Sequence, residues 1–186
     1  MGATSDYGFR YPEMSDAPNG PQALQWLAED VEDEFNRRGI VARNRRVSNS
    51  LSVTTTEYRI LSTIAPVVAG RTYTVECFGE ITPTGGPNRS QHTIRYTMNN
   101  TEPTISSPIL GRSFGWHAST IAQPDGQIVK AEFLCTTSGI LRVVVTSIRV
   151  DGSGSFVWSA SPDYPMVLRV IDEGPTVSTS GTVYSP

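Results

Sequence analysis

The chain has 186 residues, a formal net charge of −3 and a charged fraction of only 18%. So small a negative charge does not attract nucleic acid, and no run of eighteen apolar residues predicts a membrane span. Glycine (16) and proline (13) are plentiful, which is typical of many short strands joined by tight turns. We therefore expect one mainly β domain with an arm, made in a cytoplasm because the polar start is unlike a signal peptide.

Residues 1–20 carry no periodicity and are predicted to form an extended arm. Tyr7, Phe9 and Tyr11 alternate with other residues and are followed by Pro12, so an extended piece places three aromatic rings along one side. An unfolded arm would seldom carry so many aromatic residues. We expect this arm to dock on another subunit or another protein; packing against its own chain is the alternative.

Residues 21–39 are predicted to form one short helix. Asn19 and Gly20 both suit an N-cap, and Pro21 suits the first helical position, where its missing N–H costs nothing. Gly39 follows two arginines and predicts the left-handed residue that ends a helix.

The helix shows an apolar stripe of Leu24, Leu27, Val31 and Phe35, at spacings of three, four and four residues. So short a helix is marginal alone in water and needs a partner for this stripe. We favour copies of the helix packed around a symmetry axis as a short parallel bundle. The alternative is that the stripe packs on the β domain of its own chain. Trp26 lies off the stripe and indicates a second apolar contact, which favours the bundle.

From residue 48 onwards the pattern is one strand after another, and residues 40–47 are either a linker or an entry strand. We expect strands at Ser50–Thr56, Tyr58–Val67, Thr72–Thr82, Gln91–Met98, Ile105–Leu110, Trp116–Ala122, Gln127–Thr136, Gly139–Asp151, Ser155–Ser159 and Met166–Asp172. Their alternation predicts an antiparallel, jelly-roll-like β-sandwich over residues 48–175. Residues 176–186 read as a Ser/Thr-rich tail.

Catalytic chemistry has little support in the sequence. His92 and His117 form no metal-ligand spacing, and His117 is expected at a strand edge or the surface. No nucleophile elbow or phosphate-binding loop has the strand and helix that it requires. Glu76 and Glu80 share one strand face, like the carboxylates of a glycosidase, but such pairs usually face solvent. We expect no enzyme activity, cofactor or metal site.

Cys77 and Cys135 lie in strands of alternating apolar residues. Buried free thiols are the favoured interpretation, and a disulfide is the alternative. Trp158 beside Phe156 is expected in the core.

Two polar stretches, Pro83–Ser90 and Asn99–Ser107, are predicted to be surface loops, where binding residues concentrate. Asn88, Asn99 and Trp116 are therefore candidate contacts to a glycan, because an aromatic ring suits the C–H-rich face of a sugar.

Four pieces of the chain resemble minor tail and head-fibre-type structural proteins of long-tailed bacteriophages that infect actinobacteria. These pieces are Tyr7–Pro12, Ser15–Pro21, Leu27–Glu32 and Leu168–Pro175. The resemblance implies a virion component, commonly homotrimeric, with an N-terminal anchor and a distal sandwich. The helix here lacks the long shaft of a tail fibre, which leaves head or tail location open.

We therefore expect a compact, trimeric virion appendage. Its partners would be copies of itself and a capsid or tail protein bound through Tyr7, Phe9, Tyr11 and Pro12, with neither nucleic acid nor membrane. The alternative is a host-surface adhesin that binds glycan.

Overall fold

The computed structural model describes residues 2–3, 9–11, 20–117 and 125–176. Its elements in chain order are β1 (Gly2–Ala3), β2 (Arg10–Tyr11), α1 (Gly20–Arg37), β3 (Gly39–Arg46), β4 (Tyr58–Val67), β5 (Arg71–Thr84), β6 (Asn88–Thr97), β7 (Ile109–His117), β8 (Asp125–Cys135), β9 (Gly139–Gly152), β10 (Ser155–Ser159) and β11 (Met166–Pro175).

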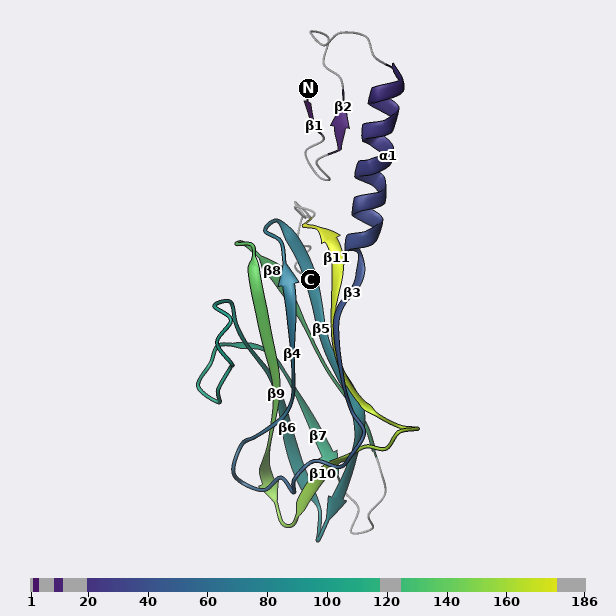
Figure 1. Ribbon diagram of the computed structural model, residues 1–186. Coiled ribbons are helices and arrows are strands. Elements are labelled where there is room, and N and C mark those ends of the chain that lie inside the picture. Colours follow the sequence, from purple (N-terminus) through teal and green to yellow (C-terminus); the bar gives the residue numbers. More distant parts are fainter. Residues whose placement is uncertain (1, 4–8, 12–19, 118–124, 177–186) are drawn as a thin grey trace, which may run out of the picture.

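Two antiparallel sheets face each other in a sandwich (Figure 1). One sheet has the order β4-β9-β6-β7. In the other, β5 pairs with β8 on one side and with β11 and β10 on the other, and β3 extends the sheet beyond β11. The structure thus confirms the predicted antiparallel, jelly-roll-like sandwich preceded by one short helix.

The core lies between the two sheets and follows the period-two alternation of the strands. Its largest fully buried side chains include Trp158, Tyr73, Phe156, Ile81, Ile94, Leu141, Met166 and Leu168. Both cysteines are buried free thiols, as predicted. Each fully buried large apolar side chain contributes about 1.5–3 kcal/mol to folding, so this layer is the main source of stability.

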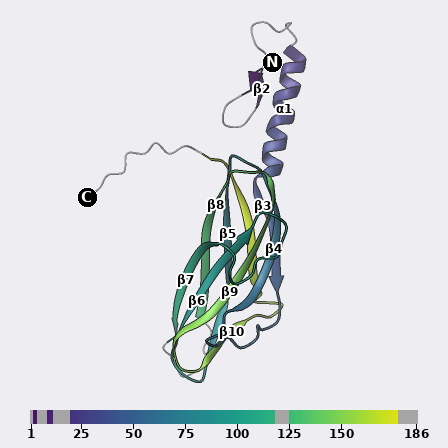
Figure 2. The same ribbon diagram turned by 90° about the vertical axis from the view of Figure 1, so that its left-hand side faces the viewer.

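Helix α1 projects from one end of the sandwich, with β1 and β2 alongside it, and β10 lies at the other end (Figures 1 and 2). Gly39 ends the helix in the predicted left-handed conformation (φ 97°). The chain then enters β3 at once, so residues 40–47 are a strand rather than a linker.

Two strand predictions were wrong. Within Ser50–Thr56 only Val53 makes a β-bridge, to Phe156, and the Ser50 N–H donates to the Trp158 carbonyl at 2.9 Å. The strand predicted at Ile105–Leu110 begins only at Ile109, as β7. Of the predicted strand Trp116–Ala122, residues 116 and 117 belong to β7, and residues 118–122 lie outside the described part of the chain.

The predicted loop Pro83–Ser90 is also wrong. Strand β5 continues through Thr84 and β6 begins at Asn88, so only a tight turn separates them. Gly85 and Gly86 adopt positive φ angles of 77° and 134°, which allow that turn.

A row of buried polar side chains crosses the core. Ser90 Oγ lies 2.8 Å from His92 Nε2 and 3.0 Å from His117 Nε2. On the other side, His92 Nδ1 lies 2.8 Å from Ser147 Oγ, to which Trp158 Nε1 donates at 2.9 Å. Burial lowers the pKa of His92 from 6.5 to about 3, so its imidazole stays neutral at physiological pH. His117 ends the edge strand β7, as one alternative predicted, but it is 2% exposed, which corrects the predicted surface position.

Acidification should destabilise the sandwich through His92. The pKa of His92 is lower in the folded than in the unfolded chain. Its contribution to the free energy of unfolding is therefore complete above pH 6.5 and falls as the pH drops towards 3. Between pH 7.5 and 5.5 the free energy of unfolding should fall by about 1.4 kcal/mol from this group, measured by urea unfolding. The free energy of unfolding of His92→Gln should fall correspondingly less over the same pH interval. An equal fall in both proteins would contradict the lowered pKa of His92.

Candidate functional site

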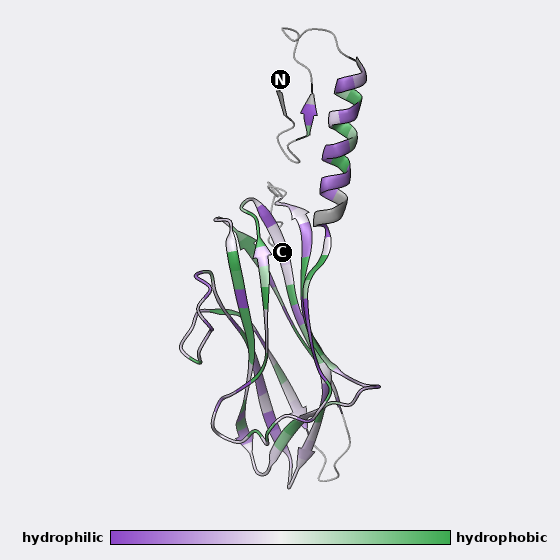
Figure 3. Ribbon diagram, in the orientation of Figure 1, coloured by the Kyte–Doolittle hydropathy of each residue, from purple (hydrophilic) through white to green (hydrophobic). Residues whose placement is uncertain are grey.

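The first candidate site is the apolar stripe of α1, formed by the exposed Leu24 and Leu27 and the half-buried Val31. Leu24 is 70% exposed and Leu27 is 43% exposed, although both are large apolar side chains. Hydrophobic and hydrophilic residues alternate along the helix in Figure 3. The predicted fourth member, Phe35, has a side chain outside the described residues. The alternative in which the stripe packs on its own sandwich does not hold for the two leucines.

The arm of the same chain covers another side of the helix. Arg10 Nε lies 3.0 Å from Asp30 Oδ1, and Arg10 Nη2 lies 2.9 Å from Glu29 Oε2. The guanidinium also stacks over the ring of Trp26 at 5.8 Å, which is a cation–π contact rather than the apolar contact predicted for that residue. With 3.6 residues per turn, these helix positions lie away from the stripe. The contacts of Arg10 therefore lie away from the stripe.

The structure describes little of the predicted docking residues. Phe9 is half-buried. Tyr7, Pro12 and the side chain of Tyr11 lie outside the described residues, so docking through them stays a prediction.

A buried ion-pair network, formed by Glu34, Arg71 and Asp172, joins α1 to the sandwich. Arg71 Nη1 donates to Glu34 Oε2 at 2.8 Å, and Arg71 Nε donates to Asp172 Oδ2 at 2.8 Å. All three residues are at most 7% exposed. Arg38 Nε adds a hydrogen bond to Glu34 Oε1 at 2.8 Å.

The charges of this junction are fully compensated. Hydrogen bonds from Arg71 hold the pKa of Glu34 below its usual value, and Glu34 and Asp172 raise the pKa of Arg71 although burial opposes this. Asp172 Oδ1 also accepts the Gly174 N–H at 2.9 Å. Because both carboxylates bind one planar guanidinium, the last turn of α1 is held in a defined direction relative to β5 and β11.

The predicted glycan contacts are not brought together. Asn88 is fully buried and its amide donates to the Gly86 carbonyl at 3.3 Å, so it cannot reach a glycan. Trp116 is 61% exposed and pairs with Arg89 at the start of β6, whereas the exposed Asn99 follows the other end of that strand. Phe114, 58% exposed, shares a face of β7 with Trp116.

A groove on the outer face of the β5 sheet is not indicated by the sequence pattern. It has a volume of about 530 Å³. Its lining includes the apolar or aromatic Phe78, Ile128 and Tyr164 and the polar Glu80, Gln127 and Asp163. They come from β5, β8 and the segment between β10 and β11, which only the sheet register brings together.

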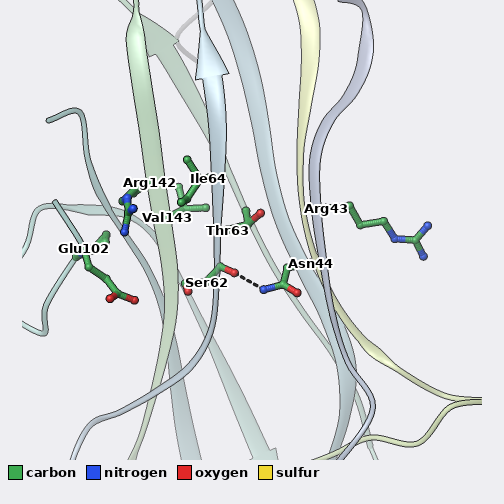
Figure 4. Close-up of a pocket in the computed structure, with 9 residues that line it drawn as sticks. Arg43, Asn44, Ser62, Thr63, Ile64, Glu102, Arg142 and Val143 are labelled. Atoms are coloured by element: carbon green, nitrogen blue, oxygen red, sulfur yellow. Dashed lines mark hydrogen bonds between the residues drawn. The ribbon is translucent and has the colours of Figure 1, made fainter. Parts of the chain in front are cut away.

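A second hollow lies where the two sheets meet at β3 and β4 (Figure 4). Asn44 Nδ2 donates to the Ser62 carbonyl across this gap at 2.6 Å, which ties the two sheet edges together. Figure 4 shows Arg43 pointing away from Glu102 and Arg142. The polar side chains do not converge, so the hollow offers no evident ligand chemistry.

The side chains suited to catalysis have structural partners. Glu76 forms an ion pair with Arg169, so it does not share with Glu80 the role of a glycosidase-like carboxylate pair. Ser90, His117 and Asp125 form a chain of contacts like that of a serine hydrolase, but Ser90 is fully buried and cannot meet a substrate. Within the described ranges, no group of three potential ligands suits a metal ion, and no helix is long and apolar enough to cross a membrane.

No protein-family model matches the chain, and no curated protein matches it. Solved structures with a similar course of the backbone include Eiger TNF from S. frugiperda, at 11% identity and a TM-score of 0.42, covering 78% of this chain and all of that one. A structure titled "CBM4 structure and function" matches at 9% identity and a TM-score of 0.33, covering 60% of this chain and 59% of that one. A Clostridium thermocellum xylanase 10B with CBM22-1 and GH10 modules matches at 9% identity and a TM-score of 0.39, covering 74% of this chain and 29% of that one. Likenesses at these scores imply neither a ligand nor an assembly for this chain.

Removing Arg71 should be costly because it leaves the buried Asp172 without its cation and leaves Glu34 with Arg38 alone. We expect Arg71→Met to lower the free energy of unfolding by about 3–5 kcal/mol in urea titrations. The matched control is Arg59→Met, since Arg59 pairs with Glu102 where the two side chains are 44% and 47% exposed. That control should cost at most about 1 kcal/mol. Equal losses would contradict a special role for the junction.

Proposed function

We propose that this chain is a virion structural protein that assembles as a compact homotrimeric appendage through α1 and displays its sandwich. The observation that carries the proposal is the open stripe of Leu24, Leu27 and Val31 on a helix that projects from the sandwich. The virion assignment rests on the resemblance of the chain ends to phage tail and head-fibre proteins.

The energetics favour a second copy as the partner of the stripe. Burying one fully exposed leucine contributes roughly 1.5–3 kcal/mol, so two leucines in each of three chains supply a substantial driving force. The 3, 4, 4 spacing is that of an eleven-residue repeat, which suits nearly straight helices side by side. The ion pairs at Arg71 hold each helix in place and reduce the entropy lost on association.

Acidic side chains beside the stripe, such as Glu32, make the proposed assembly depend on ionic strength. Parallel copies bring these carboxylates close together, and their repulsion opposes the apolar contact. Added salt screens that repulsion, so association should strengthen as the ionic strength rises.

Gold-labelled antibody against residues 39–175, imaged on purified virions, tests the location. Label on the head would indicate a capsid decoration, and label at the tail or collar would indicate a minor tail protein. Intact particles without label would contradict the virion assignment.

Carbohydrate binding by the displayed sandwich is the second candidate function. The observation that favours it is the exposure of aromatic side chains on the sandwich: Phe114, Trp116 and Tyr164 are 58%, 61% and 70% exposed. Aromatic rings with one free face suit the apolar face of a sugar, and a displayed module of this kind would act as a host-surface adhesin.

Leu27→Asp combined with Val31→Asp should convert the trimer to monomers, because each chain would place two charges in the apolar contact. Light scattering after size exclusion should show the mass falling from that of three chains to that of one. The matched control, Leu51→Asp with Ile105→Asp, changes residues that are 74% and 54% exposed outside the helix, and should stay trimeric. An unchanged mass of the helix variant would contradict this role.

A further inference from the structure

The groove on the outer face of the β5 sheet has an apolar floor made by the sheet register. Phe78 of β5 stands between Ile128 of β8 and Val167 of β11, so these side chains form one row across three strands. Ile128 is 63% exposed although it is a large apolar residue on a sheet face. Ile128 and the half-buried Phe78 therefore offer apolar surface to a ligand, whereas Val167 is only 2% exposed.

The boundaries of the groove are polar. Towards α1, the neighbouring row carries the Glu76–Arg169 ion pair, and the Arg169 guanidinium stacks on Phe78 at 5.4 Å. On the opposite side, Glu80 and Asp163 place carboxylates in the lining. Hydrogen-bond acceptors thus stand beside an apolar floor, which is the composition of small-ligand sites.

Tyr164 is held in place before any ligand arrives. The Ser161 N–H donates to the Tyr164 carbonyl at 3.1 Å, and the Tyr164 N–H donates to Ser161 Oγ at 3.1 Å. Arg45 Nη2 donates to the Pro162 carbonyl at 2.9 Å, which attaches this turn to β3. Tyr164 itself is 70% exposed at the groove. A fixed backbone that presents a free aromatic ring lowers the entropy cost of binding.

We propose that this groove binds a non-acidic oligosaccharide, an inference that rests on the second candidate function above. A pyranose ring carries C–H groups on its face and hydroxyl groups around its edge, which matches an apolar floor bordered by acceptors. Tyr164 and Ile128 contact the ring faces, and Glu80 and Asp163 accept hydrogen bonds from hydroxyl or amino groups. Arg43 also lines the groove, so these two carboxylates and one guanidinium leave one net negative charge, which disfavours uronic acids and other anionic sugars.

The groove differs from the aromatic pair on β7. Phe114 and Trp116 lie on the outer face of the other sheet, where Arg89 stacks on Phe114 at 5.7 Å. Trp116 is therefore the rival contact to Tyr164. Tyr58 of β4 supplies the control, since it is an aromatic residue of the same sandwich, 37% exposed and outside the groove.

The test uses the full chain and three immobilised probes: neutral cellohexaose, the glucosamine hexamer and anionic hexagalacturonate. We expect saturable binding to a probe without acidic groups and none to hexagalacturonate. Tyr164→Ala should weaken that binding at least tenfold, and Glu80→Gln should also weaken it, whereas Tyr164→Phe and Tyr58→Ala should leave it unchanged. Trp116→Ala is the variant that distinguishes the two aromatic surfaces. Thermal unfolding of each variant checks that it is folded.

The outcomes separate the site from the function. If binding is lost in Trp116→Ala and kept in Tyr164→Ala, the sandwich binds carbohydrate but the groove is the wrong site. Preference for hexagalacturonate would overturn the proposed ligand class. If the unmodified chain binds none of the three probes, carbohydrate binding is itself contradicted, together with the inference drawn from it.

Discussion

The organisation of the molecule depends on the guanidinium of Arg71. It binds a carboxylate from the helix and another from the last strand, in a place that water barely reaches. A buried ion pair adds little net stability compared with an apolar contact, but it tolerates only one geometry. The junction therefore fixes direction more than it stabilises the fold. Without this junction, the helix would be joined to the sandwich through Gly39 alone. Its direction, and with it the direction of the stripe, would then vary.

Two sides of α1 have different roles. Arg10 of the arm occupies the side that carries Trp26 and Asp30 through charge-assisted hydrogen bonds and stacking. The side with Leu24 and Leu27 stays open. In the proposed assembly, this apolar surface is the contact between copies of the helix, and the contacts of Arg10 lie on a different side of it.

Local patterns in the sequence predict the strands well, because the period-two alternation reports which face each strand buries. The bounds of β4 and β10 agree with prediction to the residue. Asn88 was misassigned because a polar residue in a Gly/Pro-rich stretch resembles a loop, whereas the strand register buries it. The junction at Arg71 and the groove at Tyr164 were not predictable, since each joins residues far apart in the chain through contacts that only the fold creates.

The parallel contact between copies of α1 is tested most directly by cysteine cross-linking. Cys77 and Cys135 are buried, so a cysteine introduced on the helix reports on that position alone. In a parallel bundle, Leu24→Cys meets its own copy within the 4.4–6.8 Å between Cα atoms that a disulfide requires. Mild oxidation should yield covalent dimers of Leu24→Cys but not of Gln25→Cys, which lies to the side of the stripe. If Leu24→Cys forms no more dimer than Gln25→Cys, the helix does not assemble the protein.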